Sequence, residues 1–383
     1  MDASRVVGLI SGTSVDAIDA ALADMRLSAD TIELTPVGHL EVAYPADLRD
    51  DLLNATSCNS ERMCRLDTRI GQSFANAAAT AIRELGAADV IASLGQTVYH
   101  WVEDGICRGT LQLGQPAWIA EKTGLPVISD LRARDVAAGG HGAPLAGLFD
   151  RLWLQNEVAL NIGGIANITL PNITLSGAIA YDTGPGNALL DAAAEVLTGQ
   201  RFDEDGALAK AGTVRQDLLD VLLADEYYRL PAPKSTGKEH FNIGYLKAAL
   251  AKVDEVTGPD LMATLVELTA VTIADACAGH RVVASGGGVR NPALMAALAR
   301  RLDIVTSDGL GIASDAKEAY LTAVLGFLTW HGIPADPRTG AAGPRLLGSI
   351  TPGRDPLRMP APATTTVRRL RVVAPLGGSH ARP

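Results

Sequence analysis

Three glycine-bearing turns carry the residues of this chain that are best suited to chemistry. The first, GLISGTSVDAID at residues 8–19, combines glycines and hydroxyl groups with two carboxylates. It lacks the lysine of a Walker-type phosphate loop, and the alternation after it predicts a second strand. The tip of such a hairpin can hold phosphate through successive N–H groups, and Asp16 and Asp19 suit a hydrated Mg²⁺. The alternative is a simple β-turn.

The second turn, at Gly163 and Gly164, lies between two short strands and precedes the run YDTGPGN at residues 181–187. Asp182 ends a predicted strand, just before a glycine turn and the N-terminus of a helix predicted over 188–198. The free N–H groups and the dipole of a helix N-terminus favour phosphate, so Asp182 is well placed for chemistry. The plain alternative is an aspartate that only caps the turn.

The third turn is SGGGVRNP at residues 285–292. A strand enters three glycines, after which Asn291 is expected to cap a helix with Pro292 at its first position. The match to a dinucleotide-binding fingerprint is loose, because no acidic residue follows about 20 residues later in a second strand–helix–strand unit. A glycine platform beneath an adenine or a ribose fits equally well.

The elements that must position these turns are short apolar strands that alternate with alanine-rich helices, the pattern of an α/β protein. With 383 residues the chain is long enough for about two domains. Its net charge of -10 argues against duplex nucleic acid. No apolar run suits a signal peptide or a membrane span, and four cysteines match no metal spacing. We therefore expect a cytoplasmic protein with no nucleic-acid or membrane partner.

Together with these turns, five further segments resemble the 1,6-anhydro-N-acetylmuramic acid kinases of the sugar kinase/actin-like ATPase superfamily, over residues 8 to about 325. The segments are SLGQTVYH, LRARDVAAGGHGAPLAGLFD, FDEDGALAKAG, PKSTGKEHFN and DAKEA. The resemblance implies an α/β fold of two ribonuclease-H-like lobes with a nucleotide cleft between them. We expect an N-terminal lobe over 1–148 and a C-terminal lobe over 149–350. A tail over 351–383 either packs back on the N-terminal lobe or is disordered.

The resemblance also assigns roles to single residues. Asp182 matches the family's catalytic aspartate, and Asp16 and Asp19 would hold Mg²⁺ through water. The sugar site would be lined by Gln96, Thr97, Arg132, Asp135 and Glu318. The contacts with ATP would come from Gly12, Thr13, Ser14, Val15, Asp16, Ala17, Ile18, Asp19, Gly163, Gly164, Gly184, Gly186, Asn187, Gly286, Gly287, Gly288 and Asn291.

The implied activity is ATP-dependent transfer of phosphate to an alcohol: 1,6-anhydro-N-acetylmuramic acid is opened by water and phosphorylated to N-acetylmuramate 6-phosphate, in peptidoglycan recycling. Ala17 stands where the family usually has glycine, and Leu94 where it usually has histidine, which bears on substrate preference. The alternatives are a kinase for another anhydro sugar, such as levoglucosan, and a non-enzymatic actin-like ATP-binding module. The sequence leaves open whether the protein forms a homodimer.

Overall fold

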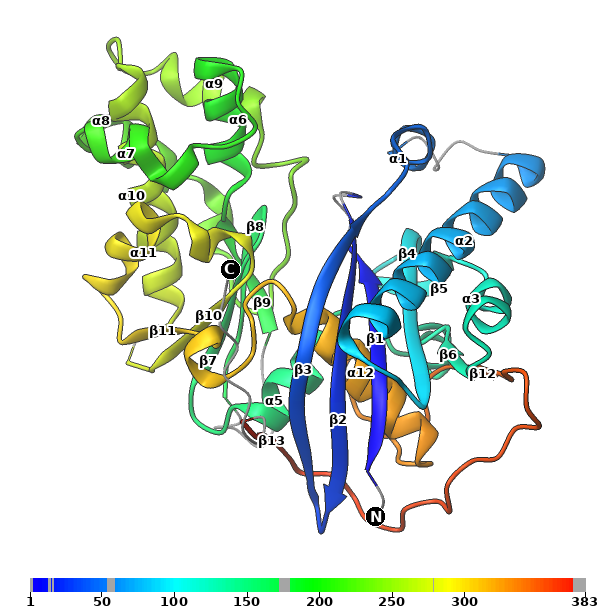
Figure 1. Ribbon diagram of the computed structural model, residues 1–383. Coiled ribbons are helices and arrows are strands. Elements are labelled where there is room, and N and C mark those ends of the chain that lie inside the picture. Colours follow the sequence, from blue (N-terminus) through cyan, green and yellow to red (C-terminus); the bar gives the residue numbers. More distant parts are fainter. Residues whose placement is uncertain are drawn as a thin grey trace. The chain divides into compact units, whose positions relative to one another are not determined.

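The computed structural model describes residues 3–12, 15, 17–53, 59–171, 180–277 and 279–374. Its contacts divide the chain into two compact units. Unit 1 combines Met1–Trp153 with Ala316–Pro383, and unit 2 is Leu154–Asp315. Figure 1 labels helices and strands of both units.

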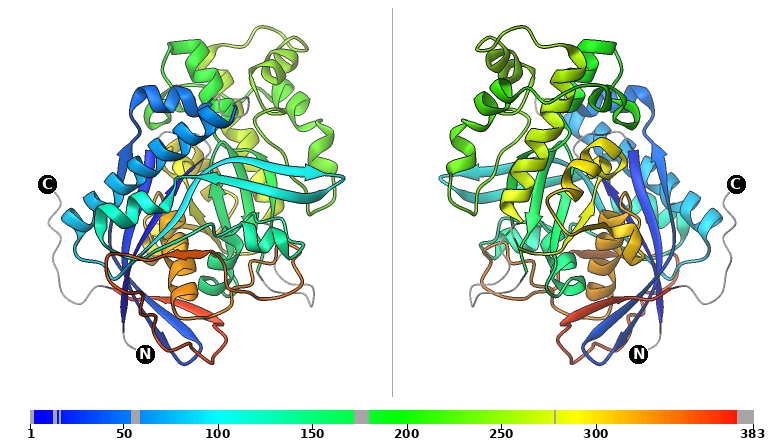
Figure 2. Two further views of the ribbon diagram at one scale, coloured as in Figure 1. Left: turned by 90° about the vertical axis from the view of Figure 1, so that its right-hand side faces the viewer. Right: turned by 90° about the vertical axis from the view of Figure 1, so that its left-hand side faces the viewer.

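Unit 1 is built on a sheet in the order β12-β6-β4-β1-β2-β3-β13, with β5 paired to β4. The first three strands form an antiparallel meander, and β4 lies parallel to β1. The bounds are β1 Ser4–Ser11, β2 Ala17–Ser28, β3 Thr31–Ala43, β4 Val90–Glu103, β5 Ile106–Leu113, β6 Val127–Ser129, β12 Ser349–Thr351 and β13 Arg369–Val372. The β4–β5 hairpin extends beyond the rest of the sheet (Figure 2).

Helices cover both faces of this sheet, which is why β1 reads as a continuous apolar run rather than an alternating one. Val7 and Leu9 pack in one core with residues of α2, and Gly8 faces α12 on the other side. A Cβ on Gly8 would lie 2.0 Å from the carbonyl oxygen of Ala319, so this glycine serves helix packing. The helices are α1 Ala46–Leu53, α2 Ser60–Leu85, α3 Pro116–Thr123, α4 Ala133–Ala137, α5 Ala146–Trp153 and α12 Lys317–Trp330.

Unit 2 has a sheet in the order β11-β10-β7-β8-β9. The strands are β7 Val158–Ile162, β8 Ile165–Thr169, β9 Ala180–Pro185, β10 Val282–Ser285 and β11 Ile304–Thr306. The helices are α6 Ala188–Thr198, α7 Ala207–Ala211, α8 Gln216–Leu223, α9 Ile243–Leu250, α10 Gly258–Ala276 and α11 Pro292–Ala299. Short 3-10 helices are η2 Glu204–Gly206, η3 Glu226–Arg229, η4 Gly287–Arg290 and η5 Ser307–Leu310.

The two sheets repeat one topology. In each, three antiparallel strands are followed by two strands parallel to the first: β1-β2-β3 with β4 and β6, and β7-β8-β9 with β10 and β11. This is the predicted α/β fold of two ribonuclease-H-like lobes, which is confirmed.

The division of the chain differs from the predicted lobe boundaries at its second junction. The stretch 316–350, which was expected in the C-terminal lobe, lies in unit 1 because α12 packs on β1 and β4. The tail also joins unit 1, since β12 pairs with β6 and β13 pairs with β3. Within the described part of the chain, no helix is long and apolar enough to span a membrane.

Candidate functional site

The first glycine hairpin joins β1 to β2 in unit 1. Thr13, Ser14 and Asp16 lie outside the described residues. Val15, whose N–H donates to the Gly12 carbonyl at 3.2 Å, has a φ of 55°. A β-branched residue rarely takes this left-handed conformation, and such strain gathers at functional sites.

The residues that follow in β2 have different exposures. The side chain of Ile18 is wholly buried, so only its backbone could reach a nucleotide. Ala17 and Asp19 are partly exposed.

Gln96 holds this hairpin from β4. It is 1% exposed, its Oε1 accepts from the Tyr44 hydroxyl at 3.2 Å, and its Nε2 donates to the Gly12 carbonyl at 3.2 Å. The register of β4 against β1 shifts at this point, where Gly95 takes a φ of 70°. Such bulges re-aim side chains. The amide of Gln96 therefore supports the β1–β2 hairpin, and its predicted contact with the sugar stays a prediction.

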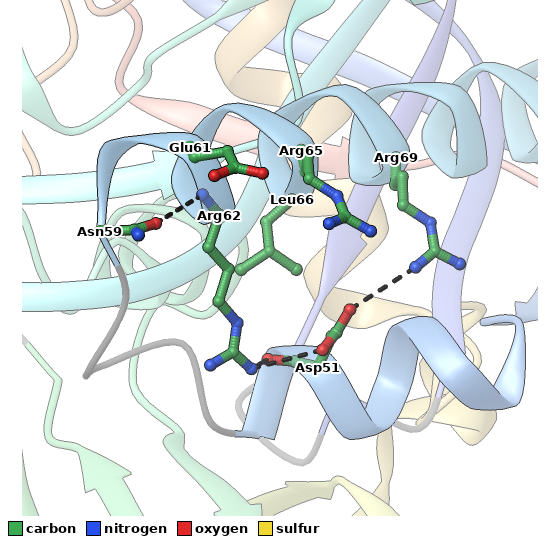
Figure 3. Close-up of a pocket in the computed structure, with 7 residues that line it drawn as sticks. All are labelled: Asp51, Asn59, Glu61, Arg62, Arg65, Leu66 and Arg69. Atoms are coloured by element: carbon green, nitrogen blue, oxygen red, sulfur yellow. Dashed lines mark hydrogen bonds and ion pairs between the residues drawn. The ribbon is translucent and has the colours of Figure 1, made fainter.

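A second support comes from α1, whose Arg49 donates from Nε to the Val15 carbonyl at 3.1 Å. Ion pairs fix α1 on α2: Arg69 lies 3.6 Å from Asp51, and Arg62 lies 3.3 Å from the same carboxylate. Figure 3 shows these side chains around a hollow of about 490 Å³. The hairpin of unit 1 is thus supported by side chains from two elements.

The second hairpin, between β7 and β8, is tied at its tip by backbone hydrogen bonds. The N–H groups of Gly186 and Ala188 donate to the Gly164 carbonyl at 2.9 Å, and that of Asn187 donates to the Gly163 carbonyl at 2.8 Å. A Cβ on Gly186 would lie 2.3 Å from the Gly163 oxygen, so no other residue fits here. Gly184, which precedes it with a φ of 147°, also needs glycine.

A lysine that sequence reasoning missed lies over this hairpin. Where Gly164 would carry a Cβ, the Cε of Lys238 is 2.5 Å away and its Nζ 3.3 Å away. Burial raises the pKa of Asp191 on α6 to about 6. The positive charge of Lys238 acts in the opposite direction and favours the ionised carboxylate. Lys238 is the second lysine of the segment PKSTGKEHFN, so the sequence shows a positive charge in this region. The spacing of the segment does not show that this side chain reaches Gly164.

Asp182 on β9 is half-buried and its carboxylate is oriented by two donors. Its Oδ2 accepts from the Ser235 hydroxyl at 2.9 Å and from the Thr236 N–H at 3.0 Å. Burial raises the pKa of Asp182, and these two hydrogen bonds act against the rise. A raised pKa and a fixed orientation both suit a carboxylate to act as a general base.

The backbone of Asp182 is held as firmly as its side chain. Its N–H donates to the Lys234 carbonyl at 3.1 Å, and its carbonyl accepts from the Tyr227 hydroxyl at 2.6 Å. The ammonium of Lys234 donates to the carbonyls of Tyr227 and Tyr228 at 3.0 and 3.1 Å. Lys234 therefore orders the loop that carries Ser235.

The third turn packs tightly at two of its three glycines. Added Cβ atoms would lie 2.5 Å from Asn161 Oδ1 at Gly286 and 2.2 Å from Ile162 Cγ2 at Gly288, whereas Gly287 faces open space. Asn291 caps α11, since its Oδ1 accepts from two backbone N–H groups at 3.0 and 3.2 Å. The predicted helix cap is confirmed, and an adenosine contact stays a prediction.

Two of the predicted sugar residues, Arg132 and Glu318, interact electrostatically. The Nη1 of Arg132 donates to the Gly142 carbonyl at 2.7 Å, and its buried Nε has no partner among the described residues. Burial lowers the pKa of Arg132, while the exposed carboxylate of Glu318 acts in the opposite direction. Burial lowers the pKa of His100, and the positive charge of Arg132 lowers it further. The Nδ1 atom of His100 is hydrogen-bonded to the Thr110 hydroxyl at 3.0 Å. Arg132, Glu318 and His100 thus form one electrostatic group.

The other two predicted sugar residues differ in exposure. Thr97 is partly exposed on β4. Asp135 is wholly buried, and its Oδ2 accepts from the Gly142 N–H at 2.8 Å and from the Thr339 hydroxyl. Asp135 therefore holds a loop beside Arg132, and a direct contact between this carboxylate and a sugar stays a prediction.

A family model described as anhydro-N-acetylmuramic acid kinase matches residues 4–353. The chain belongs to this family. The anhydro-N-acetylmuramic acid kinase of Streptomyces coelicolor is 56% identical, over 96% of this chain and 99% of that relative. That of Rhodococcus erythropolis is 54% identical, over 91% and 94%, and that of Synechococcus elongatus is 40% identical, over 90% and 99%.

Solved structures similar to this chain include xylulose kinase from Rhodospirillum rubrum, with a TM-score of 0.43 and 15% identity over 84% of this chain and 90% of that one. Another is the activator of 2-hydroxyisocaproyl-CoA dehydratase from Clostridium difficile with bound ADPNP, with a TM-score of 0.41 and 15% identity over 84% and 94%.

Members of this kinase family use ATP, which raises the question of a metal. Among the described residues, no group of three or more His, Cys, Asp or Glu side chains could hold an ion by itself. Asp19 is a partly exposed carboxylate near the first hairpin. Such a sparse donor set fits a hydrated Mg²⁺, which takes most of its ligands from water and phosphate oxygens.

Proposed function

We propose that this chain is an ATP-dependent kinase that opens 1,6-anhydro-N-acetylmuramic acid with water and phosphorylates it to N-acetylmuramate 6-phosphate, as cell-wall recycling requires. The observation that carries the proposal is the Asp182 carboxylate, which has a raised pKa and accepts two hydrogen bonds. Asp182 lies on β9, the strand that pairs with β8 of the glycine hairpin. Membership of the kinase family supplies the substrate class.

In the proposed reaction, Asp182 accepts a proton from water as the water oxygen bonds to C1 of the sugar. The bond from C1 to the bridging oxygen breaks, and its electron pair stays on that oxygen. The same oxygen, now at C6 only, attacks the γ-phosphorus of ATP, and ADP leaves with the electrons of the broken β–γ bridge. The proton on Asp182 then passes to solvent. Positioning and charge stabilisation account for most of the catalysis in such transfers.

The two glycine hairpins would present N–H groups to the phosphates, and Lys238 adds a positive charge above Gly164. Mg²⁺ would neutralise phosphate charge when bound, with Asp16 and Asp19 as its carboxylates through water.

Arg132 would grip the lactyl carboxylate of the sugar. Its Nη1 is taken by the Gly142 carbonyl, so the edge formed by Nε and Nη2 is left for this carboxylate. Glu318 would accept from a sugar hydroxyl.

An ADP-release assay with ATP and Mg²⁺ tests the proposal against its alternatives. We expect turnover with 1,6-anhydro-N-acetylmuramic acid, little with levoglucosan, and little ATP hydrolysis without sugar. In ¹⁸O-labelled water, the label should appear at C1 of the product and not in its phosphate. A preference for levoglucosan, or slow ATP hydrolysis that no sugar changes, would favour the other anhydro-sugar kinase or the actin-like module.

A further inference from the structure

The guanidinium of Arg132 is held by a glycine loop, residues 139–142. Gly139 and Gly142 have φ values of 88° and 67°, which other residues rarely adopt. The loop meets Arg132 through the Gly142 carbonyl, which accepts from Nη1 at 2.7 Å. The position of the guanidinium therefore depends on the conformation of this loop.

A segment that follows α12 lies along the loop and bonds to its backbone. We call residues 336–345 the strap. The Thr339 carbonyl accepts from the His141 N–H at 3.0 Å, and the Ala342 N–H donates to the Ala138 carbonyl at 3.4 Å. At the start of the strap, the Arg151 side chain of α5 donates to the Asp336 carbonyl. All these contacts lie within unit 1.

The strap and the loop share one buried carboxylate, that of Asp135. The Thr339 hydroxyl and the Gly142 N–H both donate to its Oδ2, and Arg345 Nη1 lies 3.7 Å from its Oδ1. A Cβ on Gly140 would lie 2.2 Å from the same Oδ2, so the loop is packed against the carboxylate. A wholly buried carboxylate is costly unless polar partners surround it, so Thr339 and Arg345 help to hold Asp135 and, with it, the loop.

We infer that the strap sets the geometry with which Arg132 meets the lactyl carboxylate, and that Thr339 and Arg345 are positioning residues for sugar recognition. The route runs from these two side chains through Asp135 to Gly142 and from there to the guanidinium. This inference rests on the proposed function. It gives a role to a segment outside the motifs that carry the family resemblance.

The test compares two substrates that differ only in one group: 1,6-anhydro-N-acetylmuramic acid and its lactyl carboxamide. The readout is the ratio of kcat/KM for the acid over that for the amide, with the KM for ATP as an internal reference. We expect Thr339→Val and Arg345→Met each to lower this ratio about tenfold, because a misplaced guanidinium loses its match to a carboxylate. Arg345→Lys should restore part of the ratio, and the KM for ATP should stay unchanged.

Two further variants make the outcomes separable. Arg132→Ala should abolish the preference for the acid, and Thr351→Val on β12 of the same unit should leave it intact. If Arg132→Ala removes the preference but Thr339→Val and Arg345→Met lower acid and amide turnover equally, the strap is only structural and the inference is overturned. If Arg132→Ala itself leaves the ratio unchanged, carboxylate recognition by Arg132 fails, and with it that part of the proposed function.

Discussion

The hairpins β1–β2 and β7–β8 occupy the same place in two sheets of one topology, yet they are supported differently. The tip of β7–β8 is tied by three backbone N–H groups at the start of α6 and needs glycine at Gly186. The tip of β1–β2 is tied by side chains, Gln96 from β4 and Arg49 from α1, and contains a strained Val15. Equivalent topology therefore does not impose equivalent supports.

The difference has a physical meaning for phosphate binding. Backbone supports cannot rotate away, so the hairpin of unit 2 presents a fixed set of N–H groups. Side-chain supports can be removed by single substitutions, so the support of the β1–β2 hairpin can be tested one hydrogen bond at a time. We therefore expect the loss of one side-chain support to weaken ATP binding less than the loss of the backbone-supported tip.

The comparison predicts first that the essential proton acceptor lies in unit 2. Asp182→Asn keeps the shape of the side chain but removes the base, so kcat should fall about 10²- to 10⁴-fold. The measurement is ADP release at saturating ATP and sugar, with the exposed Asp220→Asn as a control in the same unit. Near wild-type turnover by Asp182→Asn would contradict the assignment of Asp182 as the proton acceptor.

Next in size is the effect of breaking the backbone-supported tip. In Gly186→Ala the new Cβ would collide with the Gly163 carbonyl, separate α6 from the hairpin, and raise the KM for ATP about 100-fold. Gly147→Ala, where a Cβ meets open space, is the matched control. Circular dichroism shows whether the variant remains folded, and a folded variant with an unchanged KM would contradict the rigid-hairpin view.

The side-chain-supported tip should respond more mildly. Gln96→Ala removes one hydrogen bond to the Gly12 carbonyl and one to Tyr44, which should raise the KM for ATP about tenfold. An equal rise in the KM for ATP in Gln96→Ala and Gly186→Ala would contradict the proposed difference between the two hairpins.

A smaller effect concerns pH. The Ser235 hydroxyl stabilises the ionised form of Asp182, so Ser235→Ala should raise the pKa of Asp182 further above its ordinary value. A base with a higher pKa is protonated, and inactive, up to a higher pH. The acidic limb of the kcat/KM profile should therefore move to higher pH, with less change on the alkaline side, and Ser235→Thr should restore it. A limb that moves to lower pH would contradict the orientation by Ser235.

The smallest effect is on stability beside the second hairpin. Burial raises the pKa of Asp191 from 3.8 to about 6, so the folded chain holds this proton more tightly than the unfolded chain. The resulting stabilisation is complete below the unfolded pKa and is lost as pH rises through about 6. Asp191→Asn should therefore stabilise α6 by about 1 kcal/mol at pH 7.5, after allowance for solvent screening, and have little effect at pH 4. Hydrogen exchange of the α6 amides measures both.

Sequence predicted most where a local rule suffices. Asn291 and Pro292 predict the start of α11, and two glycines between short strands predict the β7–β8 hairpin. The assignment of Asp182 came from its place before a glycine turn and from the family motif. These signals need only neighbours along the chain.

What sequence could not predict depends on distant contacts. Gly8 was counted with the phosphate turn, but it is required by α12, more than 300 residues away along the chain. Gln96 lies in a sugar motif, yet a bulge in β4 turns it to Gly12. The ties of Asp135 to Thr339 and Arg345 likewise join residues about 200 apart. No spacing rule shows such partners.

The order in which the chain is made gives α12 a further consequence. Unit 2 is one continuous stretch, 154–315, so all of its strands are available once residue 315 has left the ribosome. Unit 1 begins with β1 but obtains α12, β12 and β13 only from the last part of the chain. During synthesis the face of β1 that carries Gly8 therefore stays uncovered until α12 has been made, so unit 1 exposes apolar surface for longer than unit 2 does.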